Sequence, residues 1–192
     1  MLTVLLTGGR SSRMGRDKAL LPVNGTPAYL LLAERYAALG EVALSADRPG
    51  HYPAEHCIEL PDRYPGCGPL NGLYSAFTKT EADTVFLTAT DLLFGDVSLV
   101  RELCSRLGGH EICAIRRENG RIETLFALYR RSCLPYVREA LETGHNSMMY
   151  LYDRADVCFV PESGLPAWEL DRTLRNFNTP EEFEQAFPGQ NG

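Results

Sequence analysis

The chain has 192 residues, which is enough for one well-filled domain and too few for two of ordinary size. Hydrophobic residues make up 44% of the chain and charged residues 23%, a globular composition that excludes disordered, collagen-like and coiled-coil proteins. The net charge of −6 argues against a general binder of nucleic acid or of membrane surfaces, because both partners need a basic face.

Predicted strands and helices alternate along the chain. Apolar runs predict strands over 2–6, 41–45, 57–60 and 84–90, and helical spacing predicts helices over 27–39 and 70–80. Further on, helices are predicted over 97–107, 134–142, 147–153 and 179–187, and strands over 111–115, 122–129, 158–160 and 174–177. The pair Asn119-Gly120 is typical of a β-hairpin. This order predicts an α/β fold with a largely parallel sheet, an antiparallel hairpin portion and helices on both faces.

Polar features follow two of the predicted strands. A glycine- and arginine-rich stretch begins after strand 2–6, and Asp91 follows strand 84–90. Ligands of parallel α/β sheets bind at the carboxyl ends of the strands. We therefore expect both features at the same edge of the sheet, with the ligand site between them.

The stretch after the first strand predicts a phosphate-binding loop. The paired glycines Gly8 and Gly9 let the backbone approach a ligand closely and direct N–H groups at it. Positive charge follows within a few residues, at Arg10, Arg13, Arg16 and Lys18. The pattern is neither a Walker A loop nor a Gly-x-Gly-x-x-Gly dinucleotide loop. The alternative is a solvated basic loop.

Asp91 is a candidate magnesium ligand. Mg²⁺ prefers one or two carboxylates together with substrate phosphate oxygens, and a carboxylate at the end of a central strand is well placed to supply one. Alternatively, Asp91 caps the segment that follows it. A cationic phosphate loop at the same sheet edge favours the metal site.

A second glycine-rich turn, PGCGP over 65–69, opens the helix predicted over 70–80. Backbone groups of such a turn could line a nucleotide pocket. Asp62, just upstream, could accept hydrogen bonds from a base or a ribose. Each feature has a plainer alternative, an ordinary loop for 65–69 and a turn residue for Asp62.

The histidines and cysteines show no metal-ligand spacing. Solvated surface is the expected environment of the histidines, which fall in predicted loops: His51, His56, His110 and His145. Apolar runs predict buried, reduced thiols at Cys104, Cys113, Cys133 and Cys158. The N-terminus lacks the basic leader of a secretory signal, and no apolar run approaches bilayer length, so the sequence predicts a cytoplasmic protein.

Together these motifs resemble the molybdenum cofactor guanylyltransferases. Residues 6–18, LTGGRSSRMGRDK, are similar to the family signature Leu-x-Gly-Gly-x-x-x-Arg-Met-Gly-x-Asp-Lys. The resemblance continues over 20–27, over 65–70 and through the strand that leads to Asp91, and it returns at 176–182 with NFNTPEE. It implies a nucleotidyltransferase on a single-domain, Rossmann-like three-layer sandwich, similar to the nucleotide-diphospho-sugar transferases. Such an enzyme joins GMP from GTP to molybdopterin and releases pyrophosphate.

The resemblance also implies roles for single residues. Asp91 would bind Mg²⁺ and substrate, and Arg13 and Lys18 would act on the phosphates as catalytic residues. Further nucleotide contacts are implied at Leu6, Thr7, Gly8, Gly9, Ser45, Asp62, Gly68, Pro69 and Leu70. Asn176 and Asn178 would lie on the acceptor side. Ser45 stands where the family commonly has asparagine.

The resemblance further implies one domain over 1–192, with the nucleotide side mainly in 1–95 and the acceptor side mainly in 96–175. The implied partners are GTP and molybdopterin, with transient contacts to cofactor-biosynthesis proteins or recipient molybdoenzymes. Neither nucleic acid nor membrane is expected as a partner.

Two alternatives stay open. One is a related nucleotidyltransferase that uses CTP or another phosphorylated acceptor, and the other is a catalytically weakened nucleotide-binding protein. Gly8-Gly9 and the Asp17-Lys18 pair favour guanylyl transfer over cytidylyl transfer. The joint presence of Lys18 and Asp91 favours an enzyme, since binding without turnover needs no metal ligand facing the phosphates.

Overall fold

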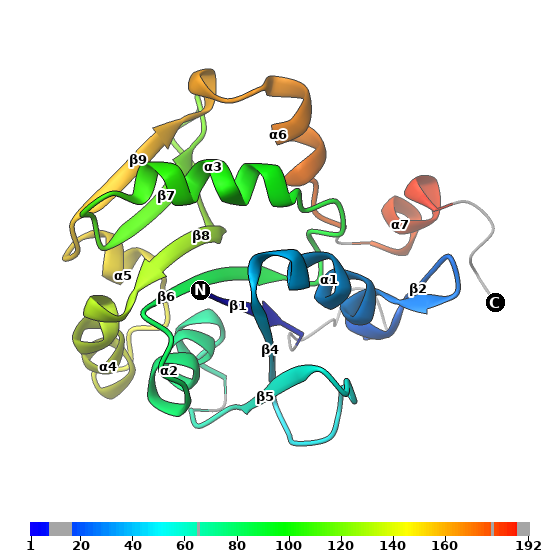
Figure 1. Ribbon diagram of the computed structural model, residues 1–192, viewed down its shortest axis with the longest axis horizontal. Helices are drawn as coiled ribbons and strands as arrows, with labels where there is room; N and C mark the ends of the chain where they lie inside the picture. Colours follow the sequence, from blue (N-terminus) through cyan, green and yellow to red (C-terminus); the bar gives the residue numbers. More distant parts are fainter. Residues whose placement is uncertain (8–16, 65, 178, 188–192) are drawn as a thin grey trace.

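The computed structural model describes residues 1–7, 17–64, 66–177 and 179–187. A seven-stranded sheet in the order β5-β4-β1-β6-β8-β7-β9 forms the middle of the molecule, and helices cover both of its faces (Figure 1). Within the described residues, no helix is long and apolar enough to cross a membrane.

The sheet is mostly parallel, as expected. Strands β5 (Cys57–Pro61), β4 (Glu41–Ala46), β1 (Leu2–Leu6) and β6 (Thr84–Ala89) run parallel to one another. Strand β8 (Ile122–Arg130) is antiparallel to β6 and to β7 (Ile112–Arg116), while β9 (Val157–Pro161) is parallel to β7. The predicted hairpin between β7 and β8 is confirmed, and its turn is closed by the Arg117 amide, which donates to the Arg121 carbonyl at 2.8 Å.

Each face of the sheet carries its own hydrophobic core. On one face lie α1 (Ala28–Tyr36), α3 (Val97–Leu107), α6 (Ala167–Thr173) and α7 (Pro180–Ala186). On the other lie α2 (Pro69–Lys79), α4 (Leu134–Glu142) and α5 (Met149–Tyr152). Strand β1 is buried on both sides along its whole length, which explains why its sequence is apolar at successive positions.

Short elements complete the chain. Four 3₁₀ helices occur among the described residues: η1 (Lys18–Leu20), η2 (Ala37–Leu39), η3 (Arg131–Cys133) and η4 (Glu162–Gly164). A two-stranded hairpin of β2 (Pro22–Val23) and β3 (Thr26–Pro27) was not predicted. Its turn residues Asn24 (φ 53°) and Gly25 (φ 82°) both have positive φ, as the tight turn between hairpin strands requires. The Asn-Gly signal was therefore present, but the flanking strands are too short to show a period.

The strand predicted over 174–177 is wrong. Helix α6, which was not predicted, ends at Thr173, and the residues after it do not join the sheet. Leu174 and Phe177 are buried, so their apolar character reflects packing in the core that also contains α1 and α3. The Phe177 amide donates to the carbonyl of Asp91 at 3.3 Å, outside any strand ladder.

The cysteines are free thiols in mixed environments. Cys113 and Cys133 are buried as expected, Cys158 is half-buried, and Cys104 is exposed, which corrects its expected burial. Helix α3 buries Leu99, Val100, Leu103 and Leu107. Cys104 therefore lies beside this apolar stripe and not within it.

The turn after Asp91 leaves no room for a side chain at Gly95. A Cβ atom there would lie 1.8 Å from the hydroxyl oxygen of Tyr36, whose side chain is fully buried. We expect Gly95→Ala to lower the free energy of unfolding by about 1–3 kcal/mol through overpacking. Gly109→Ala is the matched control, because a Cβ at Gly109 meets nothing within 4 Å. Equal urea-unfolding midpoints for the two variants would contradict this packing.

Candidate active site

The carboxyl ends of three neighbouring strands build one edge. Leu6 of β1 pairs with Ala89 of β6 and with Ser45 of β4. The amide and hydroxyl of Thr7 both donate to the Ser45 carbonyl, at 3.1 and 2.9 Å. Thr7 and Asp91 therefore leave the sheet side by side, as their positions after the two strands predict. Gly8, Gly9 and Arg13 lie outside the described residues.

One oxygen atom of the Asp91 carboxylate is buried without a hydrogen bond from the described residues. Within the described part of the chain, no hydrogen-bond donor reaches its buried Oδ1 atom. Burial raises the pKa of the Asp91 carboxyl, and the positive charge of Lys18 opposes that rise. The charge of Lys18 therefore acts on the carboxyl of Asp91.

The single carboxylate of Asp91 fits a hard cation that takes most of its ligands from substrate and water. Among the residues described, no group of three or more His, Cys, Asp or Glu side chains could hold a metal ion. One carboxylate with a free oxygen is the protein contribution typical of Mg²⁺ when substrate phosphates and water complete its shell. A structural zinc site would need more protein ligands.

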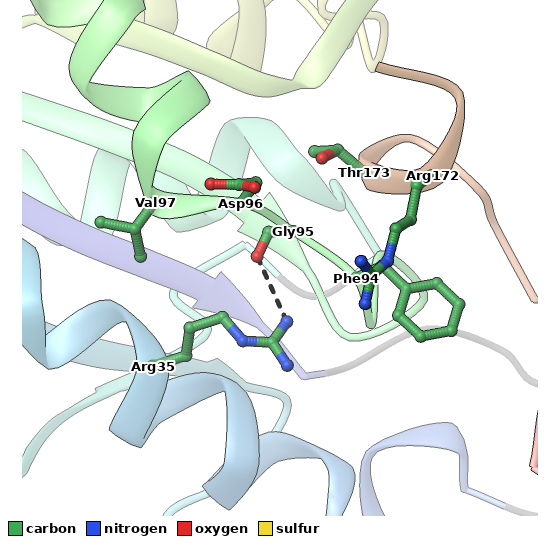
Figure 2. Close-up of a pocket in the computed structure, with 7 residues that line it drawn as sticks. All are labelled: Arg35, Phe94, Gly95, Asp96, Val97, Arg172 and Thr173. Carbon is green, nitrogen blue, oxygen red and sulfur yellow. Dashed lines mark hydrogen bonds between the residues drawn. The ribbon is translucent and has the colours of Figure 1, made fainter. Parts of the chain in front are cut away.

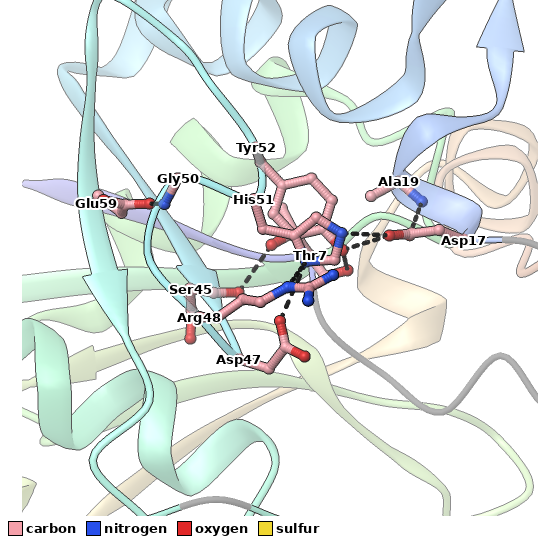
Figure 3. Close-up of polar contacts among 10 residues, drawn as sticks. All are labelled: Thr7, Asp17, Ala19, Ser45, Asp47, Arg48, Gly50, His51, Tyr52 and Glu59. Atoms are coloured by element: carbon pink, nitrogen blue, oxygen red, sulfur yellow. Dashed lines mark hydrogen bonds and ion pairs between the residues drawn. The ribbon is translucent and has the colours of Figure 1, made fainter.

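Lys18 begins η1, directly after Asp17, which caps this short helix. The Oδ1 atom of Asp17 accepts the Ala19 amide at 3.0 Å, and its Oδ2 atom accepts the Tyr52 hydroxyl at 2.7 Å (Figure 3). His51 Nε2 lies 3.6 Å from the same Oδ2 atom.

His51 corrects the expectation that every histidine is solvated. Its side chain is 22% exposed, its ring stacks on Tyr52 with centroids 4.3 Å apart, and its Nδ1 lies 3.1 Å from Asp47. His56 and His145 are exposed as expected, and His110 is partly exposed beside Asp156.

Asn71, which the sequence did not single out, organises the turn between β5 and α2. It is fully buried at the start of α2, and its Oδ1 atom accepts the amides of Arg63 and Tyr64 at 3.0 and 2.9 Å. Its Nδ2 atom donates to the carboxylate of Asp62. A buried amide that satisfies three partners has no periodic signature, so only the folded structure could show its role.

Asp62 and Ser45 are brought together beside the N-terminus of α2. Burial raises the pKa of the Asp62 carboxyl, while hydrogen bonds from Asn71 and Ser45 lower it. Gly68 precedes the helix with a φ of 54°, and Pro69 is its first residue. The side chain of Leu70 is fully buried, so a nucleotide could meet only its backbone.

The C-terminal motif reaches the same edge through Phe177, whose amide donates to the Asp91 carbonyl. Asn176 is half-buried next to this contact, and Asn178 lies outside the described residues. Phe177 packs on the rings of Phe94 and Phe183, with centroids 5.6 and 6.3 Å apart. Helix α7 begins with a capping box between Thr179 and Glu182.

A cavity of about 340 Å³ lies beside the turn that follows Asp91 (Figure 2). No residue of the predicted site lines it; its lining residues are Arg35, Phe94, Gly95, Asp96, Val97, Arg172 and Thr173. Arg35 donates to the carbonyls of Leu93 and Gly95 at 2.6 and 3.2 Å, which braces the turn. Leu92 and Leu93, which follow Asp91, are buried in the core.

Comparison with known proteins gives a consistent result. The pattern of the MobA-like NTP transferase domain matches residues 3–157. A protein from Carboxydothermus hydrogenoformans named "Probable molybdenum cofactor guanylyltransferase" is 30% identical over 96% of this chain and 94% of its own length. A protein of the same name from a Geobacillus strain is 28% identical over 96% of each chain.

A solved structure, molybdopterin-guanine dinucleotide biosynthesis protein A from Archaeoglobus fulgidus, has the same fold. Its TM-score is 0.83 over 97% of both chains, at 19% sequence identity. The three-layer arrangement expected from the sequence is therefore confirmed.

The raised pKa of Asp91 has a cost in stability that Asp91→Asn should remove. Because the folded-state pKa lies above the ordinary 3.8, wild-type stability falls as pH rises through the folded pKa. We expect Asp91→Asn to be the more stable protein at pH 7, with Tm higher by about 2–4 °C for each kcal/mol recovered. The difference in Tm between the variant and the wild type should become smaller as the pH is lowered toward 4. A lower Tm for Asp91→Asn at pH 7 would contradict burial as the dominant effect.

Proposed function

Because the chain belongs to the MobA-like NTP transferase family, and is therefore a nucleotidyltransferase, we propose that it transfers GMP from GTP to molybdopterin and releases pyrophosphate. Relatives that it matches along nearly their whole length carry the name molybdenum cofactor guanylyltransferase. The observation that carries the proposal is that the charge of Lys18 acts on the buried Asp91 carboxyl, which lies just after β6 at the edge where β1 also ends.

Mg²⁺ is the proposed cofactor, held by Asp91 and by phosphate oxygens of the nucleotide. The free Oδ1 atom of Asp91 supports this assignment. The bound ion would supply positive charge at the α-phosphate, where two anions must approach each other.

The proposed reaction is an in-line displacement at phosphorus. An oxygen of the acceptor's terminal phosphate forms a bond to the α-phosphorus of GTP, the bond to the β-phosphate oxygen breaks, and pyrophosphate leaves with that electron pair. Positioning and charge neutralisation dominate such reactions, and little covalent chemistry is asked of the protein. Lys18 would stabilise the departing pyrophosphate. Arg13 and the amides of Gly8 and Gly9 keep the same role as predictions from the sequence.

The guanine base is proposed to lie against Asp62 and the start of α2. Guanine presents N–H donors on its pairing edge, which a carboxylate can accept. Ser45 and Asn71 hold the Asp62 carboxyl in place, and Gly68, Pro69 and Leu70 offer backbone groups beside it. Leu6 and Thr7 would contact the nucleotide from the end of β1.

The acceptor is proposed to bind on the side built mainly by residues 96–175, with the nucleotide side mainly in 1–95 of one domain. Asn176 and Asn178 would contact the acceptor. The hydrogen bond between Phe177 and Asp91 supports this placement, because it brings the C-terminal motif to the proposed metal ligand.

Loss of either central charge should stop transfer without unfolding the protein. We expect Lys18→Ala and Asp91→Ala each to lower kcat by about 10²–10⁴-fold, because each removes charge that the transition state needs. Pyrophosphate release from GTP and molybdopterin is the measurement.

Arg138→Ala and Asp153→Ala are the controls, since they remove an exposed cation from α4 and an exposed carboxyl after α5. Both should retain wild-type turnover. Near-normal transfer by Lys18→Ala or Asp91→Ala would remove that residue from the mechanism.

Nucleotide choice should depend on the charge of Asp62. Calorimetry with Mg²⁺ present should show tighter binding of GTP than of CTP or ATP. Asp62→Asn keeps an oxygen that can accept from Asn71 and removes the charge, so we expect it to weaken GTP binding by about tenfold and leave ATP binding unchanged. Tighter CTP binding would favour a cytidylyltransferase. Tight GTP binding without pyrophosphate release in the presence of molybdopterin would favour a binding protein.

A further inference from the structure

The hydroxyl of Tyr52 joins two residues that lie ten positions apart in the sequence (Figure 3). It lies 3.1 Å from the carbonyl oxygen of Thr7 and 2.7 Å from Oδ2 of Asp17. Both partners are acceptors, so one phenol proton serves both, and the shorter contact is the charge-assisted one. Tyr52 itself comes from the segment between β4 and β5.

These two partners lie next to the proposed catalytic charges. Thr7 follows β1, which is hydrogen-bonded to β6, and Asp91 follows β6. Asp17 precedes Lys18 and caps the short helix that Lys18 begins. A tie between Thr7 and Asp17 therefore fixes the backbone of Lys18 relative to the sheet edge that carries Asp91.

The Tyr52 ring is itself held firmly. Its side chain is buried, with His51 stacked on it at 4.3 Å and Tyr29 packed at 5.3 Å. His51 Nε2 also lies 3.6 Å from Oδ2 of Asp17, so a second side chain of this segment contacts the same carboxylate. Burial raises the pKa of the Tyr52 phenol, and the Asp17 carboxylate raises it further. The phenol therefore stays protonated and keeps its role as a donor at neutral pH.

We propose that Tyr52 is a positioning residue of this site, which sets the place of the Lys18 ammonium relative to Asp91 by holding Thr7 and Asp17 together. The expected change in kcat rests on the proposed function. The expected displacement of Lys18 rests on the geometry alone. Tyr52 touches neither substrate nor metal in this scheme.

The chain offers a direct probe, because Lys18 and Lys79 are its two lysines. Reductive methylation with ¹³C-formaldehyde labels both, together with the terminal amine. Lys79→Arg identifies the Lys79 signal. The variant Tyr52→Phe removes the hydroxyl and keeps the ring. Tyr129→Phe is the matched control, since its buried hydroxyl donates to the Thr124 carbonyl at 2.7 Å in the core on the other face of the sheet.

We expect Tyr52→Phe to move the NMR signal of Lys18 while leaving that of Lys79 in place, and Tyr129→Phe to move neither signal. An unchanged Lys18 signal in folded Tyr52→Phe would overturn the proposal, and so would an equal displacement in Tyr129→Phe. Should Tyr52→Phe fail to fold, Asp17→Asn weakens the same hydrogen bond from the other side and should displace Lys18 in the same direction.

Kinetics test the functional half separately. We expect Tyr52→Phe to lower kcat for GMP transfer by about 10–100-fold, with KM for GTP changed less than threefold. Adding Tyr52→Phe to Lys18→Ala should cost little more, because the two residues act as a unit. If the fold losses in kcat of the two single variants multiply in the double variant, the positioning role is overturned. Wild-type protein that transfers no GMP would contradict the proposed function instead, and the Lys18 signal would still decide whether Tyr52 positions it.

Discussion

A carboxylate that has lost water needs a compensating charge, and the arrangement at Asp91 follows from that need. Burial at the end of a central strand raises its pKa, and Lys18 supplies part of the compensation. The remaining demand falls on the Oδ1 atom, which no donor of the described residues reaches. The parallel pairing of β1 with β6 places Thr7 and Asp91, which lie just after the two strands, at one edge of the sheet. Around that edge, Asn71 orients Asp62, and Tyr52 joins Thr7 to Asp17.

The sequence predicted the elements whose signal is local. Strand β1 and helices α3 and α4 have the predicted bounds, since a fully buried strand and an amphipathic helix each show their own period. The error at 174–177 has a different origin. Hydrophobic residues there predict burial correctly, but pairing with a neighbouring strand is a long-range event that no local pattern records.

The site divides in the same way. Asp91 and Lys18 could be selected because charged residues after apolar strands are conspicuous. Asn71 and Tyr52 could not, because their importance lies in partners far along the chain: Asn71 reaches Asp62, and Tyr52 reaches Thr7 and Asp17. Supporting groups of this kind look like ordinary core residues until the fold brings their partners to them.

The hydrogen bond from Phe177 to Asp91 has a consequence for biosynthesis. Thr7 and Asp91 are synthesised before Phe177, so this support can form only after residue 177 has emerged from the ribosome. A nascent chain can thus complete its seven-stranded sheet, whose last strand ends at Pro161, before Phe177 can donate to Asp91. A polypeptide cut short between Pro161 and Phe177 would hold every strand of the sheet and still lack this contact with Asp91.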